Sequence, residues 1–88
     1  MIVSMIKFGD ILISRPSGRE AFLAARSCLF KDTPEQDSII LDFKNVKVLA
    51  PSWCNEFITG FKSLYRNRIE VVNTDLPGVT AALNFVLP

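Results

Sequence analysis

The sequence predicts an α/β fold in which short apolar strands alternate with amphipathic helices. Three runs rich in Ile, Val and Leu, at residues 2–8, 38–43 and 69–72, have the length and composition of strands. The intervening segments 17–30 and 52–66 repeat apolar residues at helical spacing. Strands that alternate with helices favour right-handed crossovers and a largely parallel core sheet.

Length and composition indicate one small domain over residues 1–88, with a mixed sheet of about four strands and about three helices. Hydrophobic residues make up 49% of the chain and seven are Phe, which favours a packed core. The apolar run 2–8 stops at Gly9 and Asp10 with no cleavage site after it, so we expect no signal peptide. No apolar run approaches the roughly 20 residues that span a bilayer, and we expect a cytoplasmic protein.

The first third of the chain predicts a strand, a turn and a helix. Residues 11–13 continue as a second short strand or lead into the helix. Pro16 disfavours helical conformation at Arg15, so the helix is expected over residues 17–30. A polar loop should follow over residues 31–38. The predicted inner face of this helix consists of Ala21, Phe22, Ala25, Cys28 and Leu29.

The remaining elements are expected to surround a central strand at residues 38–43 that is covered on both faces. Ser52 should cap the second helix, and Pro77 should lie near the start of the last one. The inner stripe of the second helix is Trp53, Phe57, Phe61 and Leu64, flanked by Cys54, Ile58 and Tyr65. That of the last helix is Val79, Ala82, Leu83 and Val86. The residues predicted to be largely buried are Phe22, Cys28, Phe43, Trp53, Phe57, Phe61 and Leu83.

The residues that usually carry catalysis are missing or scattered. The chain has no His, its glycines form no phosphate-binding loop, and no pair of carboxylates has a spacing typical of acid–base chemistry. Cys28 and Cys54 fall in apolar helical stripes, which is typical of buried thiols in a reducing compartment and not of a disulfide or zinc site. We therefore expect no enzyme, no metal and no cofactor. The net charge of +1 gives no field for nucleic acid or a membrane surface.

Asp42 is a carboxylate at the end of the predicted central strand, and it has two interpretations. Backbone N–H groups at the strand end can satisfy it, which is a structural role. Alternatively it belongs to a site, because α/β sheets usually bind ligands at the carboxyl ends of their strands.

Arg15, Arg19 and Arg26 form the basic cluster of the chain, and Leu23 and Phe30 share the helix face of the last two. This face is either an ordinary solvated surface or a docking surface with an arginine rim. A third interpretation is that Arg15 and Arg19 bind a phosphate or nucleotide near Ser52.

The segment 41–57 carries the most specific pattern in the sequence. It contains Asp42-Phe43, then Val46, then Ser52-Trp53 and Glu56-Phe57. This order resembles the STAS family, whose best-known members are anti-sigma factor antagonists. It is most similar to the STAS-like domains of unknown function in bacterial signalling proteins, which also share Phe8-Gly9 and Ser14-Arg15.

The resemblance implies a non-catalytic protein–protein interaction module that regulates a signalling partner, such as a histidine-kinase-type ATPase or a transcription regulator. In STAS antagonists the corresponding loop carries a phosphorylated serine, and Pro51 takes that position here. We therefore expect constitutive binding, or control through Ser52. Asn55, Thr59 and Lys62 share one outward face of the second helix and complete the expected partner-binding surface.

Two alternatives remain at this point. One is a small phosphate- or nucleotide-binding domain, and the other is a structural subunit of a larger complex. The protein is expected to be a monomer or a weak homodimer.

Overall fold

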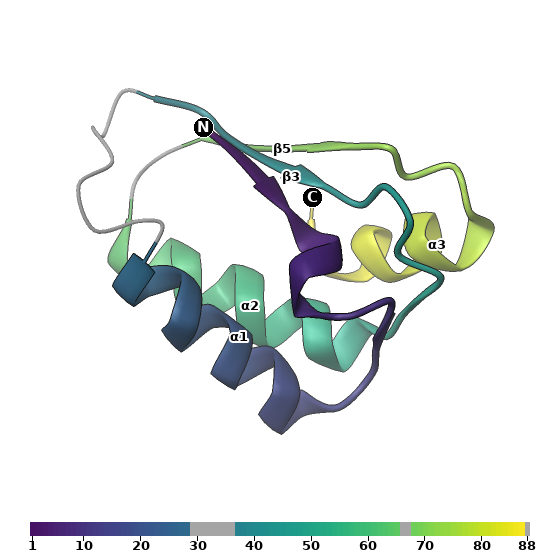
Figure 1. Cartoon of the computed structure of the whole chain (residues 1–88), viewed down its shortest axis with the longest axis horizontal. Coiled ribbons are helices and arrows are strands. Elements are labelled where there is room, and N and C mark those ends of the chain that lie inside the picture. Colours follow the sequence, from purple (N-terminus) through teal and green to yellow (C-terminus); the bar gives the residue numbers. More distant parts are fainter. Residues whose placement is uncertain (29–36, 66–67, 88) are drawn as a thin grey trace.

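A computed structural model describes residues 1–28, 37–65 and 68–87 and confirms the α/β class (Figure 1). The strands are β1 (Ile2–Ser4), β2 (Ile11–Leu12), β3 (Ile39–Asp42), β4 (Val48–Leu49) and β5 (Ile69–Val72). The helices are α1 (Arg15–Cys28), α2 (Pro51–Leu64) and α3 (Pro77–Val86), with a 3₁₀ turn, η1, at Met5–Phe8. The loop predicted at residues 31–38 lies largely outside the described residues, as do the predicted ends of the first two helices.

The strands form two small sheets in which every pair is parallel. β3 lies in the centre of the first sheet, in the order β1-β3-β5, as predicted. β2 and β4 form the second sheet, so the strands do not join into one mixed sheet. The reason is that the predicted strand 2–8 ends at Ser4, and η1 then turns the chain away. Gly9 closes this turn at φ 124, a conformation that suits glycine, and its N–H donates to the Ile6 carbonyl over 2.9 Å.

In the described part of the chain, the helices that cover the three-stranded sheet lie on one of its faces (Figure 1). In Figure 1, α1 and α2 lie side by side on that face, and α3 lies beyond the carboxyl ends of the strands. On the other face Ile2 is 67% exposed and Val72 is 40% exposed. The expectation that β3 is covered on both faces is therefore wrong. The outward positions next to it include the polar Ser4 and Glu70, which tolerate water.

Helix α1 begins two residues earlier than predicted. The Ser14 hydroxyl accepts the Ser17 N–H over 3.2 Å, and the Ser14 carbonyl accepts the Gly18 N–H over 3.1 Å. Ser14 is thus the capping residue, which was not predicted from the sequence. Pro16 fits inside the first turn because that position needs no N–H donor, which overrides its effect on Arg15.

The core contains six of the seven residues predicted to be buried. Phe22, Phe43, Trp53, Phe57, Phe61 and Leu83 are all at most 6% exposed. Cys28 is exposed, and Leu64 of the predicted α2 stripe is 54% exposed. Both predictions are wrong. Leu64 is the last residue of α2, where the packed stripe ends, and Cys28 lies at the surface although Ala25, one turn earlier, is buried.

The two thiols should differ sharply in reactivity. Cys54 is 1% exposed, and burial raises the pKa of its thiol to about 12. We expect a chromogenic thiol reagent to modify one thiol, Cys28, in the native protein and both in denaturant. Because unfolded Cys54 ionises near the ordinary thiol pKa of 9.0, stability should fall as pH rises from about 9 towards 12. Equal reaction rates for both thiols in the native protein would contradict this burial.

Candidate functional site

The carboxyl end of β3 is held by Asp42. Its Oδ1 accepts the Lys44 N–H over 3.0 Å and the Asn73 side-chain N–H over 2.7 Å. The bond from Asn73 and then the bond from Lys44 lower the pKa of Asp42. The structural interpretation of Asp42 is therefore supported, although one of its two donors is a side chain from the loop after β5. Asp42 ties that loop to the loop after β3.

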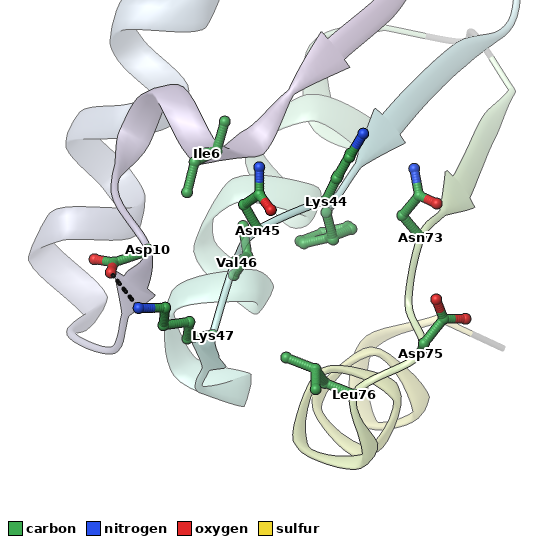
Figure 2. Close-up of a pocket in the computed structure, with 10 residues that line it drawn as sticks. Ile6, Asp10, Lys44, Asn45, Val46, Lys47, Asn73, Asp75 and Leu76 are labelled. Atoms are coloured by element: carbon green, nitrogen blue, oxygen red, sulfur yellow. Dashed lines mark ion pairs between the residues drawn. The ribbon is translucent and has the colours of Figure 1, made fainter.

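An open hollow lies beside this tie, at the carboxyl ends of the strands (Figure 2). Its volume is about 780 Å³. The lining residues come from four segments and are Ile6, Asp10, Phe43, Lys44, Asn45, Val46, Lys47, Asn73, Asp75 and Leu76. Asn45 and Asn73 both adopt positive φ, at 70 and 58. Lys47 Nζ lies 3.9 Å from Asp10 Oδ2, and this pair joins two walls of the hollow. None of the residues predicted to bind a partner or an anion lines it.

The tie between Asp42 and Asn73 can be tested by titration. Asn73→Ala removes the bond that lowers the Asp42 pKa most, so the pKa should rise towards the ordinary Asp value of 3.8. Because the folded pKa is depressed, the stabilisation is present above the unfolded pKa and is lost as pH falls through the folded pKa. The variant should therefore lose part of this acid-sensitive stabilisation. Carbon-detected NMR of the Asp42 carboxyl measures the shift, and an unchanged pKa would refute the tie.

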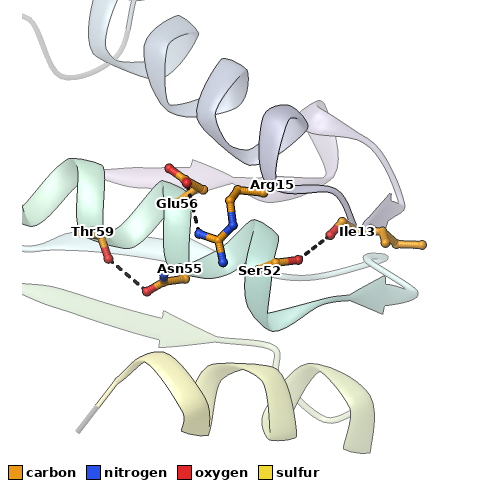
Figure 3. A network of polar contacts seen from close by, with 6 residues as sticks. All are labelled: Ile13, Arg15, Ser52, Asn55, Glu56 and Thr59. Carbon is orange, nitrogen blue, oxygen red and sulfur yellow. Dashed lines mark hydrogen bonds and ion pairs between the residues drawn. The ribbon is translucent and has the colours of Figure 1, made fainter.

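Ser52 does not cap helix α2. The helix begins at Pro51 with Ala50 before it, so Ser52 lies inside the first turn. The prediction of a cap is wrong because proline at the first helical position moves the start one residue earlier. The Ser52 hydroxyl instead donates to the Ile13 carbonyl over 2.9 Å (Figure 3), which fastens α2 to the segment before α1.

The outward face of α2 matches its predicted phase. Asn55, Thr59 and Lys62 are all exposed, and the Thr59 hydroxyl donates to Asn55 Oδ1 over 3.1 Å. Arg15 lies at the start of α1, and its guanidinium is 3.1 Å from Glu56 Oε1 (Figure 3). The side chains of this ion pair are 54% and 26% exposed.

A second, smaller hollow, of about 450 Å³, is lined in part by residues of the predicted site. Its lining residues are Arg15, Pro51, Ser52, Asn55, Phe85 and Val86. The structure thus brings Arg15 to Ser52 and Asn55, whereas Thr59, Lys62 and Arg19 lie outside the hollow. Phe85, 81% exposed, is a residue of this site that was not predicted from the sequence. Its phase opposite Val79, Ala82 and Leu83 is the signal that could have found it.

The Ser52 bond gives a prediction for stability. Ser52→Ala should lower the free energy of unfolding by about 0.5–1.5 kcal/mol, because the Ile13 carbonyl loses its donor. Ser52→Thr retains a hydroxyl and is the matched control, with a smaller expected change. Chemical denaturation measures both. If alanine and threonine were equally well tolerated, the bond would have no stabilising role.

Metal-binding clusters and membrane spans are both absent from the described parts of the chain. Among these residues, no group of three or more His, Cys, Asp or Glu side chains is placed to hold a metal ion. Within residues 1–28, 37–65 and 68–87, no helix is long and apolar enough to cross a membrane.

The described elements form a small α/β domain, an arrangement consistent with the STAS-like class. A family model described as "STAS-like domain of unknown function (DUF4325)" matches residues 27–79, which is more than half of the chain. The chain belongs to this family, and the resemblance in segment 41–57 is confirmed. The match contains all of α2 but neither Arg15 nor Phe85. A search of the curated proteins found no match, and a search of the solved structures found none either.

Proposed function

We propose that this protein is a non-catalytic module that docks a protein partner on the outward surface of α2. This docking face consists of Ser52, Asn55, Thr59 and Lys62. The observation that carries the proposal is the hollow beside it, which the exposed Phe85 lines together with the polar residues Arg15 and Asn55. An exposed aromatic side chain with a polar rim is typical of protein interfaces.

Side chains at and beside the docking face are held in place by contacts within the chain. The Thr59 hydroxyl bond restrains the Asn55 side chain, and Glu56 restrains Arg15 at the edge of the hollow. Side chains that are already ordered lose less conformational entropy when a partner binds. Lys62 extends the docking face by a further turn of α2 and adds one positive charge.

The resemblance to STAS domains suggests the class of partner, a histidine-kinase-type ATPase or a transcription regulator. Pro51 has no hydroxyl to phosphorylate, which leaves constitutive binding or control through Ser52. Phosphorylation of Ser52 would remove the hydroxyl donor to Ile13 and place negative charge beside that carbonyl. Modification would therefore break the contact between α2 and the segment before α1, and would also change the charge of the docking face.

The test is capture of the partner with three forms of the protein. Wild type should retain a binding protein that mass spectrometry identifies as a signalling ATPase or regulator. Asn55→Ala/Thr59→Ala/Lys62→Ala should lose it. The control Ser4→Ala/Lys7→Ala/Glu70→Ala changes three exposed residues elsewhere and should keep it. Equal capture by all three forms would refute the docking face, and capture within a stable multi-subunit assembly would favour a structural subunit.

The alternative role, binding of a phosphate or nucleotide, would use a different part of the structure from the predicted arginine pair. Glu56 neutralises Arg15 and Arg19 does not line the hollow beside Ser52, so the predicted arginine pair is not brought together there. The larger hollow at the strand ends, with Lys44 and two Asn on its walls, is the better place for a small ligand. Thermal shift with nucleotides and inorganic phosphate tests this alternative. A stabilisation that Lys44→Ala abolishes would support it.

A further inference from the structure

Helix α3 has no charged residue on either face. Its ten residues bury Val79, Ala82 and Leu83 against the rest of the chain. The outward residues are Gly78, Thr80, Ala81, Asn84 and Phe85, all of them exposed. A helix at the surface normally presents charged side chains to water. In Figure 3, α3 runs along the lower edge of the view, and α2 lies above it.

Gly78, Ala81 and Phe85 follow one stripe of this outward surface. Their spacing of three and then four residues covers about two turns of helix. Phe85 is 81% exposed, more than any other large hydrophobic residue in the described ranges. At the other end, a Cβ added to Gly78 would meet no atom within 4 Å. The stripe therefore has a projecting ring at one end and an open, shallow surface at the other.

From this geometry we infer that α3 pairs with α3 of a second copy of the chain. In an antiparallel pair centred between Ala81 and Ala82, Phe85 of each copy lies over Gly78 and Ala81 of the other. The arrangement has two-fold symmetry, so the same patch serves both copies. Each copy supplies one projecting ring and one surface of small residues that admits it.

A second copy is the occupant that the charges favour. An uncharged face meets its own copy without repulsion between like charges, whereas a partner chosen by charge would find nothing on α3 to recognise. The contact is short, because ten residues of helix span about 15 Å. So small an interface gives a weak, rapidly exchanging dimer and not an obligate one.

This inference rests on α3 alone, but a second copy and the proposed partner would compete for one side chain. Phe85 also lines the hollow beside Ser52, so the α3 pair would cover one wall of it. The variants that test pairing therefore include Gly78, which lies outside that hollow.

Sedimentation velocity across a concentration series tests the pairing. Wild type should show a sedimentation coefficient that rises with concentration towards that of a dimer. Phe85→Glu places charge on the face, and Gly78→Leu fills the surface that receives the ring, so each should weaken association by roughly tenfold or more. Leu64→Glu, at a 54% exposed position on α2, is the control and should associate like wild type.

All three substitutions are at exposed positions, and matched thermal unfolding curves should show that the variants fold. Wild type that remains monomeric at millimolar concentration would overturn the inference. So would a dimer that persists in both Phe85→Glu and Gly78→Leu, because association would then use another face. Mixed-label NMR adds a direct measurement, since contacts between the Phe85 ring of one copy and Gly78 of the other are expected.

Discussion

Replacing Phe57 with alanine is expected to lower the free energy of unfolding by about 3–5 kcal/mol, the usual range for a buried aromatic ring. Phe57 is 1% exposed and lies at the centre of the aromatic core. Its ring stacks on Trp53 at a centroid distance of 5.5 Å and meets Phe22 edge-on at 6.2 Å. The centroid of the Phe8 ring lies 5.6 Å from that of the Phe57 ring. The loss is comparable with the whole stability of a chain of this size.

The matched control is the same substitution at Phe85, which is 81% exposed. Phe85→Ala should change stability by no more than about 0.5 kcal/mol, as is usual for surface positions. Chemical denaturation at low protein concentration compares the two variants under conditions that disfavour pairing. If Phe57→Ala unfolded at nearly the same midpoint as Phe85→Ala, the burial of α2 described above would be wrong.

The second large effect is expected at Gly18, where α1 crosses α2. A Cβ at this position would lie 2.4 Å from the Trp53 carbonyl oxygen and 3.0 Å from the Trp53 Cα. These are backbone atoms that no side-chain rotation can move, so the two helices must separate. Gly18→Ala should therefore destabilise the protein by about 3 kcal/mol, at the upper end of the usual range for overpacking.

Two other helical glycines provide the comparison. At Gly60 the added Cβ would lie 2.7 Å from the Phe22 ring, which can shift, so a smaller loss is expected. At Gly78 it would meet no atom within 4 Å, and alanine should stabilise the helix by up to about 1 kcal/mol. Thermal unfolding should rank the variants Gly78→Ala, Gly60→Ala and Gly18→Ala, from most to least stable. Alanine tolerated equally at Gly18 and Gly78 would refute the close helix contact.

Hydrophobic periodicity was sufficient to predict the strand at residues 69–72 and the core-facing stripe of α2. The strand at residues 69–72 has the predicted bounds, and the α2 stripe places Trp53, Phe57 and Phe61 in the core. These predictions succeed because burial of an apolar stripe is the dominant local force. Periodicity also placed Cys28 and Leu64 on the apolar stripes of their helices, but both side chains are exposed.

The polar contacts of the candidate site were harder to predict because they depend on tertiary contacts. Nothing in the local sequence shows that Ser52 faces the Ile13 carbonyl, which is 39 residues away. The same holds for Asp42 and Asn73, which meet only because β3 and β5 pair in register. In contrast, the outward phase of Asn55, Thr59 and Lys62 follows from helix geometry alone.

The hollow beside Ser52 has one wall that could be predicted from the sequence and one that could not. Its α2 wall was expected from sequence, but Phe85 reaches it from a helix about thirty residues further on. The outward position of Phe85 could have been derived from the phase of α3. That Phe85 lines the same hollow as Arg15 and Ser52 became apparent only from the fold.

The most direct test of the proposed function is a map of amide chemical shifts when the captured partner is titrated into the labelled protein. We predict that the largest changes fall on Ser52, Asn55, Thr59 and Lys62, with the control residues Ser4, Lys7 and Glu70 unaffected. Changes confined to Lys44, Asn45 and Asn73 at the strand ends, or to the uncovered face of the sheet, would contradict the proposal.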